Sequence, residues 1–333
     1  MRMLATSSFA VVVSLAALTS GAAGCSSSSA GGGATPTVTA DQAASDAAAA
    51  YCARVAACTP FYMLIGYGDQ ATCASRMKTQ FLGVIGAAGT GSTPAQFETC
   101  AGAIPGVTCA DLFATNLPDT CKPVAGTGAK GAVCADHSQC VTKFCGVDPA
   151  KGICGVCADP PAAEAACVTN DCQDGQTCGT DAKCHKIGAL NDACDANHTC
   201  NTTLTCFGAK CVTPGAVGAD CDPLGTAKPT HVPCDAVTGL WCNLKSKKCE
   251  ATVENAAAGA TCGLNATTGT LTVCDAKDYC SITNTTTYSG TCVARVADGG
   301  TCDTTKPALG GPCITPANCT GGKCVVKDPT TCK

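Results

Sequence analysis

The pattern of apolar and polar positions divides the chain into stretches of different character. Residues 9–18, FAVVVSLAAL, are continuously apolar, whereas residues 26–38, SSSSAGGGATPTV, offer almost nothing to bury. Helix start signals and helix-forming residues occupy residues 39–122. Beyond residue 122 no helical periodicity remains, and short polar loops separate closely spaced cysteines. The pattern therefore predicts an apolar leader, a flexible tether, a helical region and a region without helices.

The helical region predicts a compact domain of four helices. An Ala-rich segment of high helix propensity follows the capping box TADQ, residues 39–42, and TPAQ, residues 93–96, combines an N-cap with Pro at N1. The expected N-caps are Thr39, Asp69, Thr93 and Thr108.

This domain has a small expected core of aromatic residues and cysteines. The aromatic members are Tyr51, Phe61, Tyr62, Tyr67, Phe81, Phe97 and Phe113, and the cysteines are Cys52, Cys58, Cys73, Cys100, Cys109 and Cys121. Cys52 and Cys58 point to different faces of one helix, so each is expected to bond to another helix rather than to each other. An even number of cysteines predicts that these bridges stay within the domain.

Beyond residue 122 the cysteines recur as six modules of four. Short runs of small residues precede the first cysteine of each module, and two cysteines, Cys157 and Cys332, are left over. The first cysteines are Cys134, Cys167, Cys194, Cys221, Cys262 and Cys302. Each module has too few apolar residues to fold by burial, so its bridges must stabilise it, and four cysteines leave three pairings open. Short Gly-containing loops such as CFGAKC predict β-hairpins, and a row of such modules predicts a rod.

The cysteine count points to export and leaves one thiol without a partner. The chain of 333 residues has 33 cysteines, a frequency typical of exported disulfide-rich proteins. Arg2 and the short apolar run resemble a signal peptide rather than a membrane span, and GAAGC, residues 21–25, resembles the lipobox of bacterial lipoproteins. That resemblance implies a lipid anchor on Cys25, with Ser26 favouring the outer membrane, and it leaves an even number of cysteines. The alternative is an ordinary signal cleavage that leaves Cys25 free or removes it.

The cysteine rhythm of residues 123–333 resembles the Dickkopf N-terminal cysteine-rich family, and the whole chain is similar to cysteine-rich surface lipoproteins of myxobacteria. We accordingly expect a small disulfide-rich fold, in which a helical disulfide-bonded domain precedes an array of about six short β-hairpin modules. The expected boundaries are a signal peptide over 1–24, a Ser/Gly-rich tether over 25–38, the helical domain over 39–122 and the repeats over 123–333.

Charge and motifs indicate no enzyme and no cofactor. The balance of 21 Lys and Arg against 25 Asp and Glu, with no basic run, argues against a nucleic-acid partner. GTGAKG, residues 126–131, lacks the strand and helix of a dinucleotide site, and CGVC, residues 154–157, is interpreted as structural cysteines. NDCQDGQTCGTD, residues 170–181, echoes a calcium loop but has Cys172 where an oxygen ligand is needed. The histidines are expected mostly at the solvated surface, so we predict no catalytic residue, no cofactor and no metal ligand.

These observations favour a lipid-anchored protein of the cell surface or outer membrane, structural or adhesive in role, that recognises a surface protein or a polysaccharide. The alternative is a disulfide-rich inhibitor of an extracellular hydrolase. Phe144, Trp241 and Tyr279 each precede the third cysteine of a module, where a short strand is expected. Each side chain either covers its own disulfide or, on stacked modules, contributes to an aromatic recognition stripe.

Overall fold

A computed structural model gives the fold, and it describes residues 38–148, 152–167, 172–222, 230–255, 257–303, 305, 308–309 and 311–332. The α-helices are α1 (Ala40–Cys58), α2 (Pro60–Tyr67), α3 (Gln70–Gly86), α4 (Pro94–Ala103) and α5 (Cys109–Phe113). Short 3₁₀ helices are η1 (Ile104–Gly106), η2 (Asp119–Cys121), η3 (His137–Gln139), η4 (Ala236–Thr238) and η5 (Pro329–Thr331). In the described residues, no helix has both the length and the hydrophobicity needed to cross a bilayer.

The strands are short and mostly paired within one module. They are β1 (Val133–Cys134), β2 (Cys145–Gly146), β3 (Gly155–Cys157), β4 (Gln176–Cys178), β5 (Cys184–Lys186), β6 (Thr205–Phe207), β7 (Lys210–Val212), β8 (Leu240–Cys242), β9 (Cys249–Ala251), β10 (Val253–Asn255), β11 (Thr261–Leu264), β12 (Leu271–Cys274), β13 (Asp278–Asn284), β14 (Ser289–Ala294), β15 (Ala308–Leu309), β16 (Asn318–Thr320) and β17 (Lys323–Val325). Antiparallel hairpins join β4 to β5, β6 to β7, β8 to β9 and β16 to β17. Two larger sheets have the orders β1-β3-β2 and β10-β12-β11-β14-β13-β15.

The four expected N-caps are confirmed. The hydroxyls of Thr39, Thr93 and Thr108 and the carboxylate of Asp69 each accept a hydrogen bond from a backbone N–H in the first turn. The reciprocal half of the predicted capping box TADQ is absent, because Gln42 donates to Asp46 instead. The sequence placed the helix starts correctly because a cap is satisfied by residues that are neighbours in the chain.

The prediction of four helices is wrong, because a fifth helix, α2, follows α1 directly. Thr59 ends α1 and precedes α2, and Pro60 occupies the first turn of α2 without a side-chain cap. Proline is tolerated there because the first N–H groups of a helix have no partner within it. The signal was present in the sequence, but it lacks the capping residue pair that marked the other starts.

The core of the helical domain forms around α1, whose small side chains admit close neighbours. Ala44, Ala47 and Ala48 are almost fully buried, and α1 packs against α3, α4 and α2. Tyr51 of α1 meets Phe81 of α3 edge to face, with ring centroids 6.3 Å apart. The disulfides Cys52–Cys73, Cys58–Cys109 and Cys100–Cys121 cross-link the helices. Cys52 and Cys58 therefore bond to other helices, as expected.

All six modules share one disulfide pattern, in which the first cysteine bonds to the third and the second to the fourth. The pairs are Cys134–Cys145 and Cys140–Cys157, Cys167–Cys178 and Cys172–Cys184, Cys194–Cys206 and Cys200–Cys211, Cys221–Cys242 and Cys234–Cys249, Cys262–Cys280 and Cys274–Cys292, and Cys302–Cys319 and Cys313–Cys324. We number these modules one to six. The pattern fixes the pairing that the sequence left open, and no bridge joins residues 52–121 to the modules.

The assignment of cysteines in module one is corrected. Cys157, and not Cys154, is its fourth cysteine, and it bonds to Cys140 across β3. Cys154 bonds instead to Cys332 at the other end of the repeat region, over a sequence separation of 178. The spacing alone could not distinguish the two cysteines of CGVC, because both lie within reach of the module.

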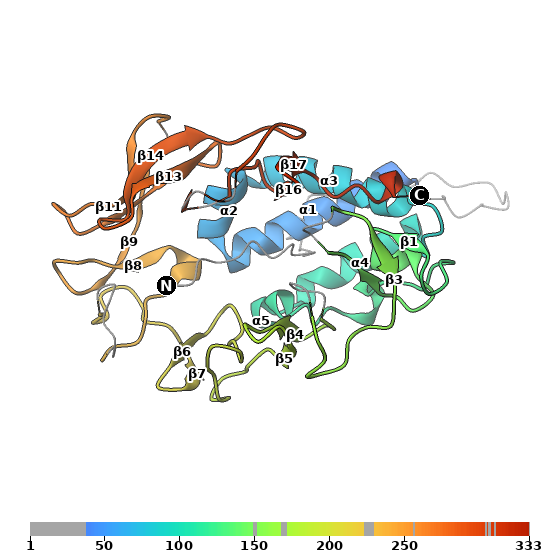
Figure 1. The fold of residues 1–333 in the computed structure, drawn as a ribbon, viewed down its shortest axis with the longest axis horizontal. Coiled ribbons are helices and arrows are strands. Elements are labelled where there is room, and N and C mark those ends of the chain that lie inside the picture. The colour runs from blue at the N-terminus through green and yellow to red at the C-terminus, as the bar shows by residue number, and fades with distance from the viewer. Residues whose placement is uncertain are drawn as a thin grey trace, which may run out of the picture.

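The expected rod is also wrong, because the modules fold back around the helical domain (Figure 1). The green strands β1 and β3 lie at one end of the helices, β8 and β13 lie at the other end, and β16 and β17 lie over α3. The C-terminal η5 contacts α3, and the Cys154–Cys332 disulfide joins this end of the chain to module one. We call this disulfide the clasp, because it closes the modules into a ring.

Hydrogen bonds between the helical domain and five of the modules hold the ring in place. In module one, the carbonyl of Ser138 accepts a hydrogen bond of 2.7 Å from the backbone N–H of Gly91, which precedes α4. Modules two and three bond to α5 and the residue after it, through Gly175 N–H to Ala114 O at 3.0 Å and Asn201 Nδ2 to Ala110 O at 2.7 Å. These contacts are far apart in sequence, which is why no local pattern predicts them.

Two arginines dock the last modules. Arg295, which follows β14 of module five, donates to Ile65 O of α2 at 3.2 Å. Arg76 of α3 donates to Thr315 O of module six at 2.6 Å and forms an ion pair with Asp298 at 2.8 Å. Each guanidinium therefore joins the helical domain to the modules, using the several donors that arginine presents in a fixed geometry.

Candidate functional site

The predicted lipid anchor, Cys25, and most of the tether lie outside the described residues. The described chain begins at residue 38, and every other cysteine is in one of the sixteen disulfides. This many disulfides indicate an oxidising environment.

The structure does not bring the three aromatic residues of the expected stripe onto one surface. Phe144 is buried and stacks on His137, with ring centroids 5.2 Å apart. Trp241 and Tyr279 are half-buried and lie on β8 and β13, at the end of the helices opposite β1 and β3 (Figure 1). Modules four and five, which carry them, are joined by a hydrogen bond from Leu244 N–H to Gly269 O at 2.9 Å. Phe144 therefore serves packing, whereas Trp241 and Tyr279 remain candidates for recognition.

A shallow hollow beside the clasp exposes apolar side chains that the sequence did not single out. Val133 on β1 faces Val156 on β3, and each is 48% exposed. They line a hollow of about 410 Å³ together with Cys154, which is itself exposed. Apolar side chains gathered at a concave surface are suited to contact with another molecule.

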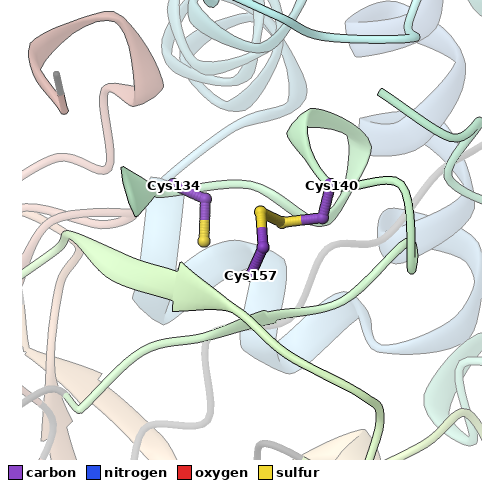
Figure 2. A group of neighbouring side chains, drawn as sticks. All are labelled: Cys134, Cys140 and Cys157. Carbon is purple, nitrogen blue, oxygen red and sulfur yellow. A yellow bond between two sulfur atoms is a disulfide. The ribbon is translucent and has the colours of Figure 1, made fainter. Parts of the chain in front are cut away.

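The cysteine clusters of the modules are not metal sites in the oxidised chain. The sulfur atoms of Cys134, Cys140 and Cys157 lie within 4.8 Å of one another, a spacing that would suit a metal ion (Figure 2). Cys140 and Cys157 are bonded to each other, and Cys134 is bonded to Cys145. A cysteine binds a metal ion only as the free thiolate, so these disulfide-bonded sulfur atoms form the compact core of each module instead.

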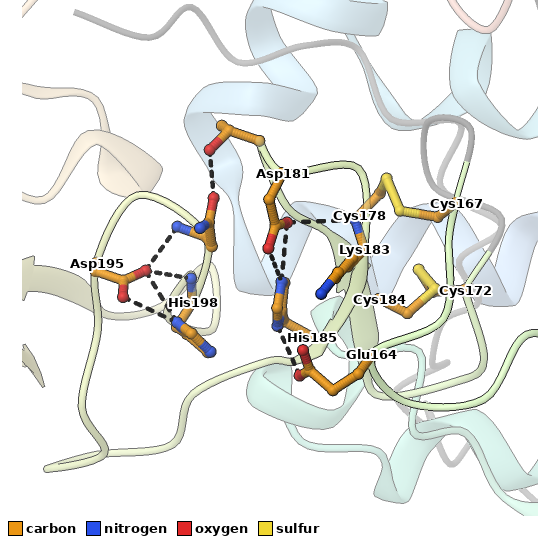
Figure 3. Close-up of polar contacts among 12 residues, drawn as sticks. Glu164, Cys167, Cys172, Cys178, Asp181, Lys183, Cys184, His185, Asp195 and His198 are labelled. Atoms are coloured by element: carbon orange, nitrogen blue, oxygen red, sulfur yellow. Dashed lines mark hydrogen bonds and ion pairs between the residues drawn. A yellow bond between two sulfur atoms is a disulfide. The ribbon is translucent and has the colours of Figure 1, made fainter.

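Two histidines and three carboxylates meet where module two adjoins module three (Figure 3). His185 on β5 has only 3% of its side chain exposed, and its Nε2 lies 3.0 Å from both carboxylate oxygens of Asp181. Its Nδ1 lies 3.0 Å from Oε1 of Glu164. His198 of module three lies beside it, with ring centroids 4.5 Å apart, and its Nδ1 lies 2.9 Å from Asp195. His185 is therefore an exception to the expectation that most of the histidines lie at the solvated surface.

The local sequence explains how this cluster forms. A tight turn follows β4 and is closed by a hydrogen bond of 2.8 Å from Gly179 N–H to Lys183 O. This turn places the carboxylate of Asp181 beside Nε2 of His185. A Cβ at position 179 would lie 2.7 Å from Cδ2 of His185, so only glycine leaves room for the ring. In module three the carboxylate of Asp195 accepts from the backbone N–H of His198 at 2.8 Å, which turns the loop so that the imidazole faces module two.

The electrostatics of the cluster favour charged groups. The hydrogen bond to Asp181 raises the pKa of His185, and burial opposes this effect without cancelling it. The same hydrogen bond lowers the pKa of Asp181. Backbone N–H groups, that of His198 first, lower the pKa of Asp195 to about 2. The ionised forms of Asp181 and Asp195 are therefore favoured beside an imidazole, that of His185, whose protonated form is favoured as well.

Sequence reasoning missed this cluster, although its signal was present. Asp181 precedes His185 by four residues, and Asp195 precedes His198 by three. Each pair is local, but their meeting depends on how two modules pack. The contact between Thr180 Oγ1 and Asn197 Oδ1 links the same two loops.

Comparison of the chain with protein-family models, with curated proteins and with solved structures finds no match.

Proposed function

We propose that this protein is a non-enzymatic, lipid-anchored protein of the outer membrane or cell surface that recognises another surface protein or a polysaccharide. The observation that carries the proposal is the covalently closed ring of modules, which holds outward-facing loops on a cross-linked helical domain. Rigid loops lose little conformational entropy on binding, so a recognition surface benefits from this architecture.

The anchor follows from the lipobox-like GAAGC and from the chemistry of Cys25. A lipid-modified amino-terminal cysteine needs no disulfide partner, which accounts for the odd cysteine count. The polar stretch of residues 26–38 then gives the folded part reach above the membrane. Acylation with two or more chains supports stable membrane binding, whereas one chain binds only marginally.

Recognition is assigned to the end of the ring that carries modules four and five. Trp241 is the only tryptophan of the chain, and it lies half-buried opposite Glu250 on the β8–β9 hairpin. Tyr279 lies opposite Val293 on the β13–β14 hairpin of the neighbouring module. Tryptophan and tyrosine are enriched at binding hot spots, and their rings stack well on sugars and apolar side chains.

Two experiments test the proposal. In cell fractionation, Cys25→Ala should move the protein from the membrane to the soluble fraction, and an unlipidated variant that stays membrane-bound would overturn the anchor. In cross-linking on intact cells, Trp241→Ala combined with Tyr279→Ala should lose the captured partner while keeping the disulfide map. Val217→Ser, at a side chain that is 75% exposed, is the matched control and should leave capture unchanged.

Undiminished capture by the folded double variant would remove modules four and five from the recognition surface. Inhibition of an extracellular hydrolase in a protease panel would favour the inhibitor function instead. The two outcomes are distinguishable, because an inhibitor acts in solution on a purified enzyme and needs no membrane anchor.

A further inference from the structure

The histidine cluster between modules two and three shares one feature with histidine metal sites, a carboxylate behind each ring. In each imidazole, Nδ1 faces a carboxylate, Glu164 for His185 and Asp195 for His198. Metal-bound histidines commonly use one ring nitrogen for the ion and donate from the other to a carboxylate, which orients the ring. Because Glu164 and Asp195 bind the two Nδ1 atoms, the two Nε2 atoms are the ring nitrogens that could bind a metal ion.

The ligands of such a site would be the two Nε2 atoms and the carboxylate of Asp181. Nε2 of His185 meets both oxygens of Asp181, whereas Nε2 of His198 makes no hydrogen bond among the described residues. The ring centroids of the two histidines are 4.5 Å apart and their planes are inclined by 56°. With Zn–N bonds of about 2.0–2.1 Å, two imidazoles on one tetrahedral ion place their centroids about 5 Å apart. The observed spacing is close to this value, and binding requires the His198 ring to turn so that its Nε2 faces Asp181.

We propose that His185, His198 and Asp181 bind one divalent ion of the zinc type at the junction of modules two and three. Two imidazoles and a carboxylate suit zinc, whereas magnesium and calcium prefer sets made only of oxygen atoms. With three protein ligands the fourth position goes to water. Glu164 and Asp195 orient the two rings from behind.

Binding requires little rearrangement at His185. Its Nε2 lies 3.0 Å from the Asp181 oxygens, and two ligands of one tetrahedral zinc ion lie about 3.3 Å apart. The ion takes the place of the proton shared by these two groups, and that proton leaves to solvent. No bond to carbon changes and no redox partner is needed, so charge and atoms balance with one proton released from this hydrogen bond.

The ion would cross-link modules two and three. His185 and Asp181 belong to module two and His198 to module three, so the coordination spans the junction beside the Thr180–Asn197 hydrogen bond. A ligand that binds only the assembled junction stabilises it by mass action. Zinc should therefore raise the resistance of residues 186–197, which connect the two modules, to proteolysis.

The test is zinc titration of the full, oxidised chain by isothermal calorimetry and native mass spectrometry. A thiol assay must first show no reduced cysteine, because thiolates of opened modules would bind zinc on their own. We expect one zinc ion per chain and at least tenfold weaker binding for His198→Ala, which changes an exposed ring. Asp181→Asn should also weaken binding. His231→Ala is the matched control, since His231 is an exposed histidine beside Asp222 in module four.

Three results would overturn the proposal. These are the absence of stoichiometric zinc binding to the folded chain, equal binding by His198→Ala and the unsubstituted protein, or equal affinity for zinc and magnesium. If His185→Ala fails to fold, the exposed His198 variant still decides the question. Loss of zinc binding would leave recognition by modules four and five untouched, so the two proposals fail independently.

Discussion

Removing the clasp should destabilise the whole protein rather than one module. The double variant Cys154→Ser with Cys332→Ser breaks the bond without leaving a free thiol to exchange with other disulfides. The bond spans a sequence separation of 178. Disulfides inside the modules shorten the covalent path between its ends to roughly 100 residues, and the chain-entropy model assigns about 5 kcal/mol to closing a loop of that size. Because the dependence on loop length is logarithmic, counting the path differently changes the value little.

The free energy of unfolding is measured in guanidinium chloride without reductant. Circular dichroism reports the helices, and the fluorescence of Trp241 reports module four, because the chain has no other tryptophan. Loss of native disulfides typically costs about 2–5 kcal/mol, so we expect a decrease in that range in both signals.

A second route to the same state serves as the control for the serine substitutions. The alanine pair Cys154→Ala with Cys332→Ala removes the same bond without adding hydroxyl groups, and it should give the same decrease. A change below about 1 kcal/mol by both routes would contradict the reasoning, since ring closure would then contribute almost nothing. Loss of module-four fluorescence alone would show that the ring opens locally.

Three further predictions concern the contacts that hold the ring. Gly239→Ala should lower the free energy of unfolding by about 1–3 kcal/mol in denaturant titration, because φ is +83° and the new Cβ would lie 2.6 Å from Phe61. Arg295→Met should cost at least about 2 kcal/mol in the same assay, because the guanidinium donates to four backbone carbonyls that would lose this partner. Burial alone would raise the pKa of Asp136, but Lys327 helps to hold it below 3.8. Its contribution to stability is therefore present above that value and lost as pH falls through the depressed pKa, and thermal melts should show that Asp136→Asn is less sensitive to acid.

The sequence predicted those features that depend on neighbouring residues. The caps at Thr39, Asp69, Thr93 and Thr108 were predictable because a side chain satisfies a backbone group three residues away. The separation of helical and module disulfides was predictable because an even number of cysteines in each region satisfies pairing without crossing.

The ring was not predictable, because long-range contacts create it. Arg295 meets a carbonyl 230 residues earlier, and nothing in its local sequence indicates that partner. The pairing of Cys154 with Cys332 likewise depends on where the C-terminus arrives after passing around the helices. The candidate metal site was missed for the same reason, since the His185 and His198 loops meet only when two modules pack.

Mapping of disulfide-linked peptides from the unreduced chain tests the closed ring most directly. Digestion and mass spectrometry should recover one peptide pair joined through Cys154 and Cys332, with Cys140 joined to Cys157 and no bridge between residues 52–121 and the modules. A Cys140–Cys154 bridge, or a Cys332 found as a free thiol, would contradict the ring and restore an open array of modules.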